Sequence, residues 1–265
     1  MKIAVFSDMH AISSREPLHE VRTSRSFFAD AWPTFVKLRA LIRAEAPDLV
    51  ICLGDMVDWY SEANRDFAIE LLNELPCPWM SVPGNHDYQL FHRTDSGVRK
   101  ISAMEGCETA RKGWLARGIE LHNRYVDTGD CGLLLLDSAL SGVPDGTKDW
   151  IAANIGKRER NLVFTHVPLD LPQIRSHILT VDAARDLNKY VQSRTPWLFD
   201  VSLAGRVSDM FTGHLHIPGM LEIAGTRMHM LGTAVTSPRR PSLQASARIV
   251  TLGRDVNVRT ISIEP

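Results

Sequence analysis

The chain has 265 residues, and its 30 lysines and arginines nearly balance its 31 aspartates and glutamates, giving a formal net charge of -1. This length suits one large α/β domain or two small ones, and it allows a sizeable core. Because the sequence offers no overall positive field for nucleic acid or an anionic membrane, an anionic ligand would have to bind locally.

The sequence gives no sign of a membrane span. Its apolar runs, such as Leu133 to Leu136, are far too short to cross a bilayer. Met1-Lys2 leads directly into the short apolar stretch Ile3 to Phe6, without the long apolar region of a secretory signal. We therefore expect a cytoplasmic protein. Its four scattered cysteines should be reduced thiols, because no Cys-x-x-Cys pair suggests a zinc ribbon and no pattern suggests a disulfide framework.

The first half of the chain alternates short apolar runs with helical periodicity. The expected elements are a strand at 3–6, a loop with some helix at 11–31, a helix at 34–44, a strand at 49–53, a helix around 67–72 and a strand at 79–82. Strands and helices that alternate in this way favour parallel pairing through right-handed crossovers.

The second half adds further strands and ends in an antiparallel β pattern. The expected strands lie at 133–136, 162–164, 210–211, 228–230, 248–252 and 256–261, and the expected helices near 109–117, from Asp149 onward and at 182–191. No repeat or linker divides the chain, so residues 1–265 are predicted to form a single domain. Two less regular stretches, 88–130 and 168–205, are candidates for a cap or lid.

Polar side chains stand directly after several predicted strands. Seven of them offer oxygen or nitrogen donors: Asp8, His10, Asp55, Asn85, His166, His214 and His216. Two pairs are spaced two residues apart, so each pair would point to one side if the extended conformation continued. The loops beyond the carboxyl ends of strands in an open α/β sheet converge on one crevice, so these donors should meet in space.

This donor set has a definite chemical preference. Carboxylate, amide and imidazole groups without a thiolate suit Mn, Fe, Zn, Co or Ni. Seven donors are too many for one ion that keeps an open position, and they suit two. Taken singly, His166 would be a structural histidine, Asp8 a helix cap and Gly213 to His216 an ordinary turn. Their joint occurrence in order favours a dinuclear metal site.

The motifs resemble those of the calcineurin-like metallophosphoesterases. In chain order they are Asp8-x-His10, Gly54-Asp55-x-x-Asp58, Gly84-Asn85-His86-Asp87, the isolated His166 and Gly213-His214-x-His216. The resemblance spans residues 8 to 216. It implies a mixed α/β (α+β) fold, a four-layer αββα sandwich of two mixed sheets, with the dinuclear site at the C-terminal ends of the strands.

The resemblance also implies a role for each motif residue. One ion would be held by Asp8, His10, Asp55 and His216, and the other by Asp55, Asn85, His166 and His214. His86 would lie beside the substrate phosphorus and stabilise charge or protonate the leaving oxygen, although it could instead merely support Asn85. Asp58 is expected to orient a ligand, and Asp87 could hold the imidazole of His86 in one tautomer.

At several motif positions the chain differs from particular branches of the family, which makes the functions of those branches less suitable for it. Trp59 stands where the protein serine/threonine phosphatases have a phosphate-binding arginine, and Asp58 stands where the purple acid phosphatases have a tyrosine. Small phosphodiesterases with a cysteine in the central motif differ from this chain at His86. The chain is most similar to bacterial cyclic-nucleotide phosphodiesterases. The resemblance therefore implies in-line attack by a metal-bridging hydroxide on a small phosphate ester, with cyclic nucleotides as the leading substrates.

Other readings stay open at this point. A phosphomonoesterase or a nucleotide-linked pyrophosphatase would use the same site, and a non-catalytic scaffold would be expected to lack ligands or His86. Outside the motifs, we expect His92 and Arg93 to lie in a solvated loop, with contact to substrate as the alternative. Arg239 and Arg240 are expected in an exposed turn before Pro241, with contact to phosphate as the alternative.

Overall fold

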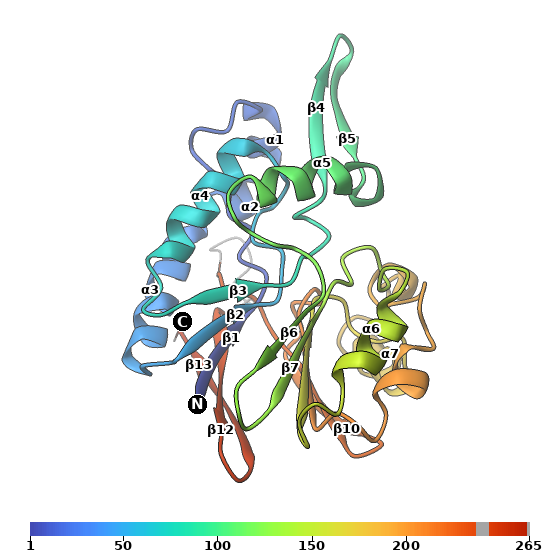
Figure 1. The fold of residues 1–265 in the computed structure, drawn as a ribbon. Helices are drawn as coiled ribbons and strands as arrows, with labels where there is room; N and C mark the ends of the chain where they lie inside the picture. Colours follow the sequence, from blue (N-terminus) through green and yellow to red (C-terminus); the bar gives the residue numbers. More distant parts are fainter. Residues whose placement is uncertain (237–243, 264–265) are drawn as a thin grey trace.

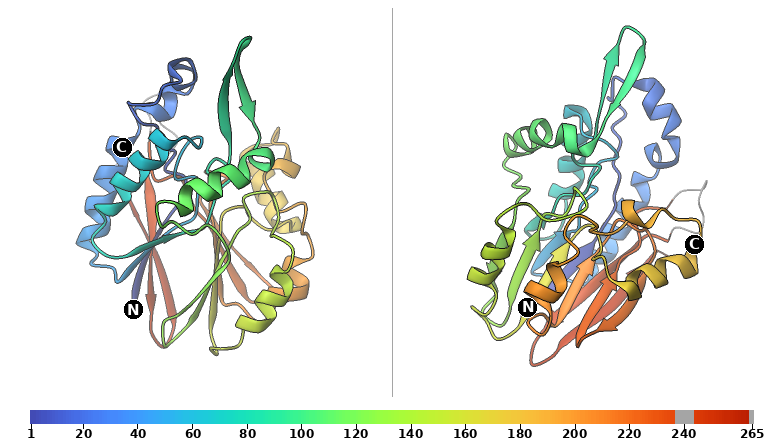
Figure 2. Two further views of the ribbon diagram at one scale, coloured as in Figure 1. Left: turned by 45° about the horizontal axis from the view of Figure 1, so that its top comes forward. Right: turned by 90° about the vertical axis from the view of Figure 1, so that its right-hand side faces the viewer.

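The computed structural model describes residues 1–236 and 244–263, which form two stacked β-sheets with helices on the outer faces (Figures 1 and 2). The first sheet has the strand order β13-β12-β1-β2-β3. Its strands are β1 (Lys2–Phe6), β2 (Leu49–Cys52), β3 (Trp79–Ser81), β12 (Ser246–Leu252) and β13 (Val256–Ser262). The first three run parallel, whereas β12 is antiparallel to both of its neighbours.

The second sheet has the strand order β10-β11-β9-β8-β7-β6. Its strands are β6 (Arg124–Asp127), β7 (Gly132–Leu136), β8 (Asn161–Thr165), β9 (Asp209–Thr212), β10 (Gly219–Ile223) and β11 (Thr226–Met230). The four central strands pair in parallel, and the two edge strands pair antiparallel. Both sheets are therefore mixed.

Side chains alternate between two cores along each strand because successive residues point to opposite faces. Ile3 and Val5 of β1 are buried between the sheets, in the same cluster as Phe164 of the second sheet. Ala4 and Phe6 face the other way, into the cluster that the outer helices cover. A short run of apolar residues thus supplies both faces of one strand.

Helices form the two outer layers. They are α3 (Trp32–Ala44) and α4 (Glu62–Asn73) on the first sheet, and α6 (Thr147–Asn154) and α7 (Pro172–Val181) on the second. Phe35 of α3 and Leu72 of α4 are buried in the cluster of the first sheet. Ile151 of α6 and Ile174 of α7 are buried in the cluster of the second. This arrangement confirms the predicted four-layer αββα sandwich.

The stretch 88–130 is more regular than the sequence interpretation allowed. It contains a hairpin of β4 (Leu90–Thr94) and β5 (Gly97–Ile101) that projects away from the sheets, followed by α5 (Ala103–Leu115) (Figure 1). Ser102 and Glu105 form a reciprocal capping box at the start of α5. A serine followed three residues later by glutamate is the usual signal for a helix start, so the sequence itself marks the beginning of α5.

The helix predicted at 182–191 is wrong. Only a short 3-10 turn, η1 (Leu187–Lys189), forms there, and α7 occupies the preceding segment. Pro172 at the first turn of α7 and the buried Ile174 and Ile178, four residues apart, explain this position. A second irregular turn, η2 (Phe199–Leu203), has π-helical hydrogen bonding.

The structure also bears on the predictions for residues 11–31, the cysteines and a membrane span. Residues 11–31 contain the short helices α1 (His19–Ser24) and α2 (Ser26–Ala29), as a loop with some helix would. All four cysteines are free thiols. Within the described part of the chain, no helix is both long and apolar enough to cross a bilayer. Arg239 and Arg240 lie outside the described residues.

Candidate metal centre

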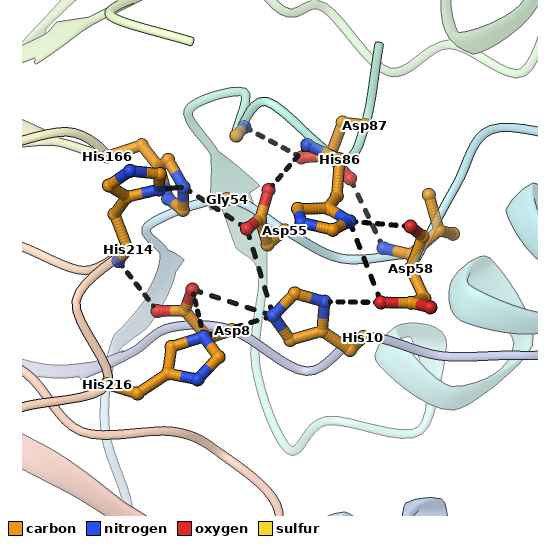
Figure 3. A network of polar contacts seen from close by, with 12 residues as sticks. Asp8, His10, Gly54, Asp55, Asp58, His86, Asp87, His166, His214 and His216 are labelled. Carbon is orange, nitrogen blue, oxygen red and sulfur yellow. Dashed lines mark hydrogen bonds and ion pairs between the residues drawn. The ribbon is translucent and has the colours of Figure 1, made fainter. Parts of the chain in front are cut away.

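The predicted ligands stand in five loops that follow β1, β2, β3, β8 and β9 and meet at one edge of the sandwich (Figure 3). The donor atoms of Asp8, His10 and His216 lie within 4.8 Å of one another, and so do those of Asp55, His166 and His214. Asn85 lines the cavity in front of both groups. Asp8 and His216, 208 positions apart in the chain, are thus brought into contact.

Left-handed backbone turns aim these side chains at one place. Asp8, His10, Asp55, His214 and His216 have φ angles of 60°, 46°, 50°, 68° and 58°. The extended conformation, which was the condition for each pair to point to one side, therefore does not continue through these pairs. Non-glycine residues in this region carry about 1–3 kcal/mol of strain each, and such residues gather at functional sites.

Glycines allow the loops to approach each other closely. A Cβ atom on Gly84 would lie 2.1 Å from Oδ1 of Asp55. A Cβ atom on Gly213 would lie 1.8 Å from Oγ of Ser7 and 2.7 Å from Oδ2 of Asp8. Neither position can hold a side chain without moving a predicted ligand.

The first group of donors places two imidazole nitrogens in contact. Nδ1 of His10 donates to Oδ1 of Asp58 at 3.1 Å, which leaves Nε2 of His10 as the atom with a lone pair. That Nε2 lies 3.1 Å from Nε2 of His216, which in turn lies 3.1 Å from Oδ1 of Asp8. Burial lowers the pKa of His10 and so favours the neutral ring that binds metals.

The second group repeats this pattern. Nδ1 of His166 donates to the carbonyl of Leu53 at 2.7 Å, and Nε2 of His214 donates to the carbonyl of Lys189 at 3.1 Å. Their other nitrogens face each other at 3.2 Å, and Nε2 of His166 lies 3.3 Å from Oδ2 of Asp55. A hydrogen on Nε2 of His166 can serve these contacts, and a metal ion in its place would be held by the same atoms.

The electrostatics of the site likewise call for positive charge. Burial works against protonation of His166, but Asp55 and Asp8 outweigh it and raise its pKa to about 9. Burial opposes the ionised form of Asp8, but His216 outweighs it and lowers the pKa of Asp8 to about 2. Oδ1 of Asn85 is buried without a hydrogen-bond partner among the described residues. These features fit two cations, which would displace the proton of His166.

His86 stands at the wall of the cavity. Its Nδ1 donates to the backbone carbonyl of Asp58 at 2.6 Å, and its backbone N–H donates to Oδ1 of Asp55 at 2.8 Å. The structure differs here from the sequence interpretation, which gave the imidazole to Asp87. The carboxylate of Asp87 instead accepts the backbone N–H groups of Gly84 and Met56, at 2.8 and 2.9 Å, and so ties the two motif loops together.

Asp58, which we expect to orient a ligand, lies beside His10 and His86. It is fully buried and contacts His10 through its carboxylate and His86 through its carbonyl. Arg25 closes the other side of the carboxylate with two hydrogen bonds of 2.6 Å. Sequence reasoning missed Arg25 because it lies in a stretch without periodicity and meets Asp58 across 33 positions.

A cavity of about 780 Å³ opens in front of the donors. Beyond the motif residues, its walls include the following side chains: Arg25, Phe27, Phe28, Lys100, Arg185, Lys189 and Tyr190. A side groove of about 410 Å³ shares Asn85, Lys189 and His214 with it and extends toward Met104 and Arg194. The two spaces therefore meet at the donor cluster.

The hairpin contributes one cation to this cavity. Lys100, on β5, lines the cavity, whereas His92 and Arg93 are exposed to solvent, as expected for a solvated loop. Arg93 pairs with Glu20 of α1 at 2.9 Å.

Comparison with known proteins agrees with this class of fold and site. Residues 1–218 match the calcineurin-like phosphoesterase family. The chain therefore belongs to that family and is a hydrolase that acts on phosphoester bonds.

One curated relative, a probable cyclic nucleotide phosphodiesterase of Coxiella burnetii, is 32% identical over 87 residues. That match spans 33% of this chain and 32% of the relative. Among solved structures, a dimetal phosphatase from Danio rerio is 15% identical, with a TM-score of 0.60 over 99% of this chain and 98% of that one. The phosphopantetheinyl hydrolase of Mycobacterium tuberculosis is 13% identical, with a TM-score of 0.51 over 88% and 89%.

Proposed function

We propose that this protein is a two-metal phosphodiesterase. The observation that carries the proposal is the convergence of two groups of carboxylate and imidazole donors, each with its ligand atoms within 4.8 Å of one another. One ion would be held by Asp8, His10, Asp55 and His216, and the other by Asp55, Asn85, His166 and His214. Mn, Fe, Zn, Co and Ni all suit these donors.

The ions and the protein side chains would have separate tasks. When bound, the ions would activate a water molecule and neutralise charge on the phosphoryl oxygens. Asp58 holds Nδ1 of His86 through its carbonyl, so Nε2 is the ring atom that can exchange a proton with the leaving oxygen. Asp87 supports this arrangement through the backbone of the central motif and does not take part in proton transfer.

The shape of the site favours a diester over a monoester. An acyclic phosphodiester carries two separate organic substituents, and the cavity and the side groove, which share Asn85 and His214, offer room for both. In a cyclic nucleotide both ester oxygens belong to one ribose, which the cavity alone would hold. A monoester would use one of these spaces only. The stretches 88–130 and 168–205 supply Lys100 and Lys189 to the walls, so we assign them a capping role within a single domain.

Cyclic nucleotides are the leading substrates. Phe27 and Tyr190 add aromatic surface to the cavity wall that would contact a nucleobase, and the exposed Lys100 and Lys189 offer positive charge to its phosphate. The similarity to a probable cyclic nucleotide phosphodiesterase supports this choice over the third of the chain that it covers.

A substrate panel tests the proposal. Protein loaded with Mn²⁺ should hydrolyse bis(p-nitrophenyl) phosphate faster than p-nitrophenyl phosphate. In a second assay it should also hydrolyse 2′,3′- or 3′,5′-cyclic nucleotides. Turnover confined to the monoester would refute the phosphodiesterase. If the protein hydrolysed bis(p-nitrophenyl) phosphate but none of the cyclic nucleotides, only the assignment of cyclic nucleotides as substrates would be refuted. Elemental analysis of untreated protein would identify the native ions.

A further inference from the structure

Arg25 makes an unusually complete contact with a buried carboxylate beside the donor cluster. Its Nε and Nη2 atoms donate to Oδ2 and Oδ1 of Asp58, each at 2.6 Å. The side chain of Asp58 is fully buried, whereas that of Arg25 is 37% exposed. A two-pronged guanidinium contact fixes the plane of a carboxylate as well as its position, which a single point charge cannot do.

Asp58 contacts two histidines of the site through different atoms. Its Oδ1 accepts the Nδ1–H of His10 at 3.1 Å, so the direction of Nε2 of His10 depends on the orientation of this carboxylate. Its backbone carbonyl accepts the Nδ1–H of His86 at 2.6 Å. Any rotation of the Asp58 side chain would therefore turn a predicted metal ligand away from its partners.

The segment that carries Arg25 also holds the face of the His10 ring. Phe28, three residues further along, stacks on His10 with ring centroids 4.1 Å apart and planes inclined by 18°. The guanidinium carbon of Arg25 lies 5.4 Å from the centre of the Phe28 ring. Arg25, Phe28 and Asp58 thus restrain one imidazole at both its outer nitrogen and its face.

We propose that Arg25 is a positioning residue. It acts through Asp58 to hold His10 for metal binding and to keep the ring of His86 in its position beside His10. The effect on metal binding stands on this geometry, and the effect on turnover rests on the function proposed above. Loss of an outer partner of a metal-binding histidine typically weakens metal affinity by about 10–100-fold. Arg25 should therefore matter most for the ion that His10 holds.

The alternative role for Arg25 is direct contact with the substrate, because the residue also lines the cavity. The two roles make opposite predictions. A substrate contact would raise KM and leave the metal affinity of substrate-free protein unchanged. A positioning residue would weaken metal binding and lower kcat, with KM within about threefold of wild type.

The test uses Arg25→Ala and Arg25→Lys in the full chain, with Arg15→Ala as the control. Arg15 pairs with Glu70 at 2.7 Å on the exposed surface, so its loss removes one arginine and one ion pair away from Asp58. Mn²⁺ is titrated into metal-free protein by calorimetry, and kcat and KM are measured with bis(p-nitrophenyl) phosphate at saturating Mn²⁺. Arg25→Ala should weaken the Mn²⁺ affinity of one of the two sites about 10–100-fold. The affinity of Arg25→Lys should lie between those of Arg25→Ala and wild type. Arg15→Ala should leave the Mn²⁺ affinity, kcat and KM unchanged.

A double-mutant cycle separates action through Asp58 from any other effect. In an Asp58→Asn background, Arg25→Ala should add less than about a threefold further loss of Mn²⁺ affinity, because interacting residues are not additive. Unchanged Mn²⁺ affinity in Arg25→Ala, or a full additional loss in the Asp58→Asn background, would overturn the proposal. If wild-type protein failed to hydrolyse the diester, the proposed function would fall, but the calorimetric result would still decide the role of Arg25.

Discussion

Nε2 of His10 and Nε2 of His216 lie 3.1 Å apart, although 206 positions separate the two residues in the chain. Two neutral imidazoles make such a contact favourably only when one of the two nitrogens carries a hydrogen. A cation between them would replace that hydrogen and bind both lone pairs. The folded state therefore gains more from metal ions than the unfolded chain, in which these residues are far apart.

Removal of metal should lower the thermal stability of the protein. At a free Mn²⁺ concentration of one hundred times Kd, a site present only in the folded state contributes about 2.7 kcal/mol. For a chain of this size that corresponds to a fall in Tm of about 5–10 °C on chelation. Calorimetric scans with and without chelator measure it, and readdition of Mn²⁺ should restore the Tm. Equal Tm values in both conditions would contradict a metal site built from these residues.

Asp55→Asn should abolish metal loading and activity together. The carboxylate lies 3.3 Å from Nε2 of His166 and 3.8 Å from Nε2 of His10, so it stands between the two donor groups. Since loss of an outer partner alone costs about 10–100-fold, loss of a shared ligand should reduce kcat/KM by more than about 100-fold. Elemental analysis and diester hydrolysis give the two readouts. Asp66→Asn, which alters a carboxylate paired with Arg117 at 2.7 Å outside the cavity, is the control and should retain both.

His86→Ala should separate metal binding from turnover. The ring is not one of the seven predicted ligands, so the metal content should stay near that of wild type. Turnover should fall by about 10²–10⁴-fold, the usual cost of losing an acid–base group. The loss should be smaller for substrates with a good leaving group, such as bis(p-nitrophenyl) phosphate, than for a cyclic nucleotide. Equal rates for His86→Ala and wild type on both substrates would exclude the role in proton transfer.

The candidate site was predictable to the extent that its residues stand at the ends of strands. Asp55 and His166 each follow a buried apolar run, and parallel strands bring such ends to one edge whatever the intervening loops do. The backbone conformation was not predictable in the same way. Asp8 and His10 adopt left-handed angles because neighbouring loops hold them there, with the N–H of His10 donating to the carbonyl of Asp55 at 2.9 Å.

The features that could not be predicted from the sequence are mostly contacts between segments far apart in the chain. Arg25 shows no local feature that distinguishes it from Arg22, and only the fold brings it to Asp58. Asp87 lies beside His86 in the chain, yet its carboxylate points to the backbone of the neighbouring loop. The capping box at Ser102 and the proline at the start of α7 were local signals, and these could have been read correctly.

Gly84→Ala should disrupt the site through packing alone. The added methyl group would lie 2.1 Å from Oδ1 and 2.3 Å from the backbone nitrogen of Asp55, and Oδ1 is held by the backbone N–H of His86. Overpacking of this kind costs about 1–3 kcal/mol, and the displaced Asp55 should also lose metal. Denaturant unfolding and elemental analysis measure the two effects. Gly253→Ala, whose Cβ would meet nothing closer than 3.9 Å, should be nearly neutral; equal behaviour of the two variants would contradict the packing argument.

A buried ion cluster in the second sheet should make stability depend on pH. Asp209 is fully buried on β9, and it accepts hydrogen bonds from Nε2 of His229 and Nη2 of Arg227, each at 2.9 Å. Burial opposes the ionised carboxylate, but the hydrogen bonds from His229 and Arg227 outweigh it and lower the pKa of Asp209.

Because the pKa of Asp209 is lower in the folded state, its contribution to stability is fully present above the unfolded pKa of about 3.9 and is lost as the pH falls through the folded pKa. Asp209→Asn should therefore cost about 1–3 kcal/mol at pH 7, and the difference from wild type should shrink below about pH 4. Urea unfolding of both proteins from pH 7 to pH 3 measures this difference. Asp130→Asn, which changes an exposed carboxylate, is the matched control. A difference between Asp209→Asn and wild type that stayed constant across this range would mean that the lost stability comes from packing and not from the ionised carboxylate.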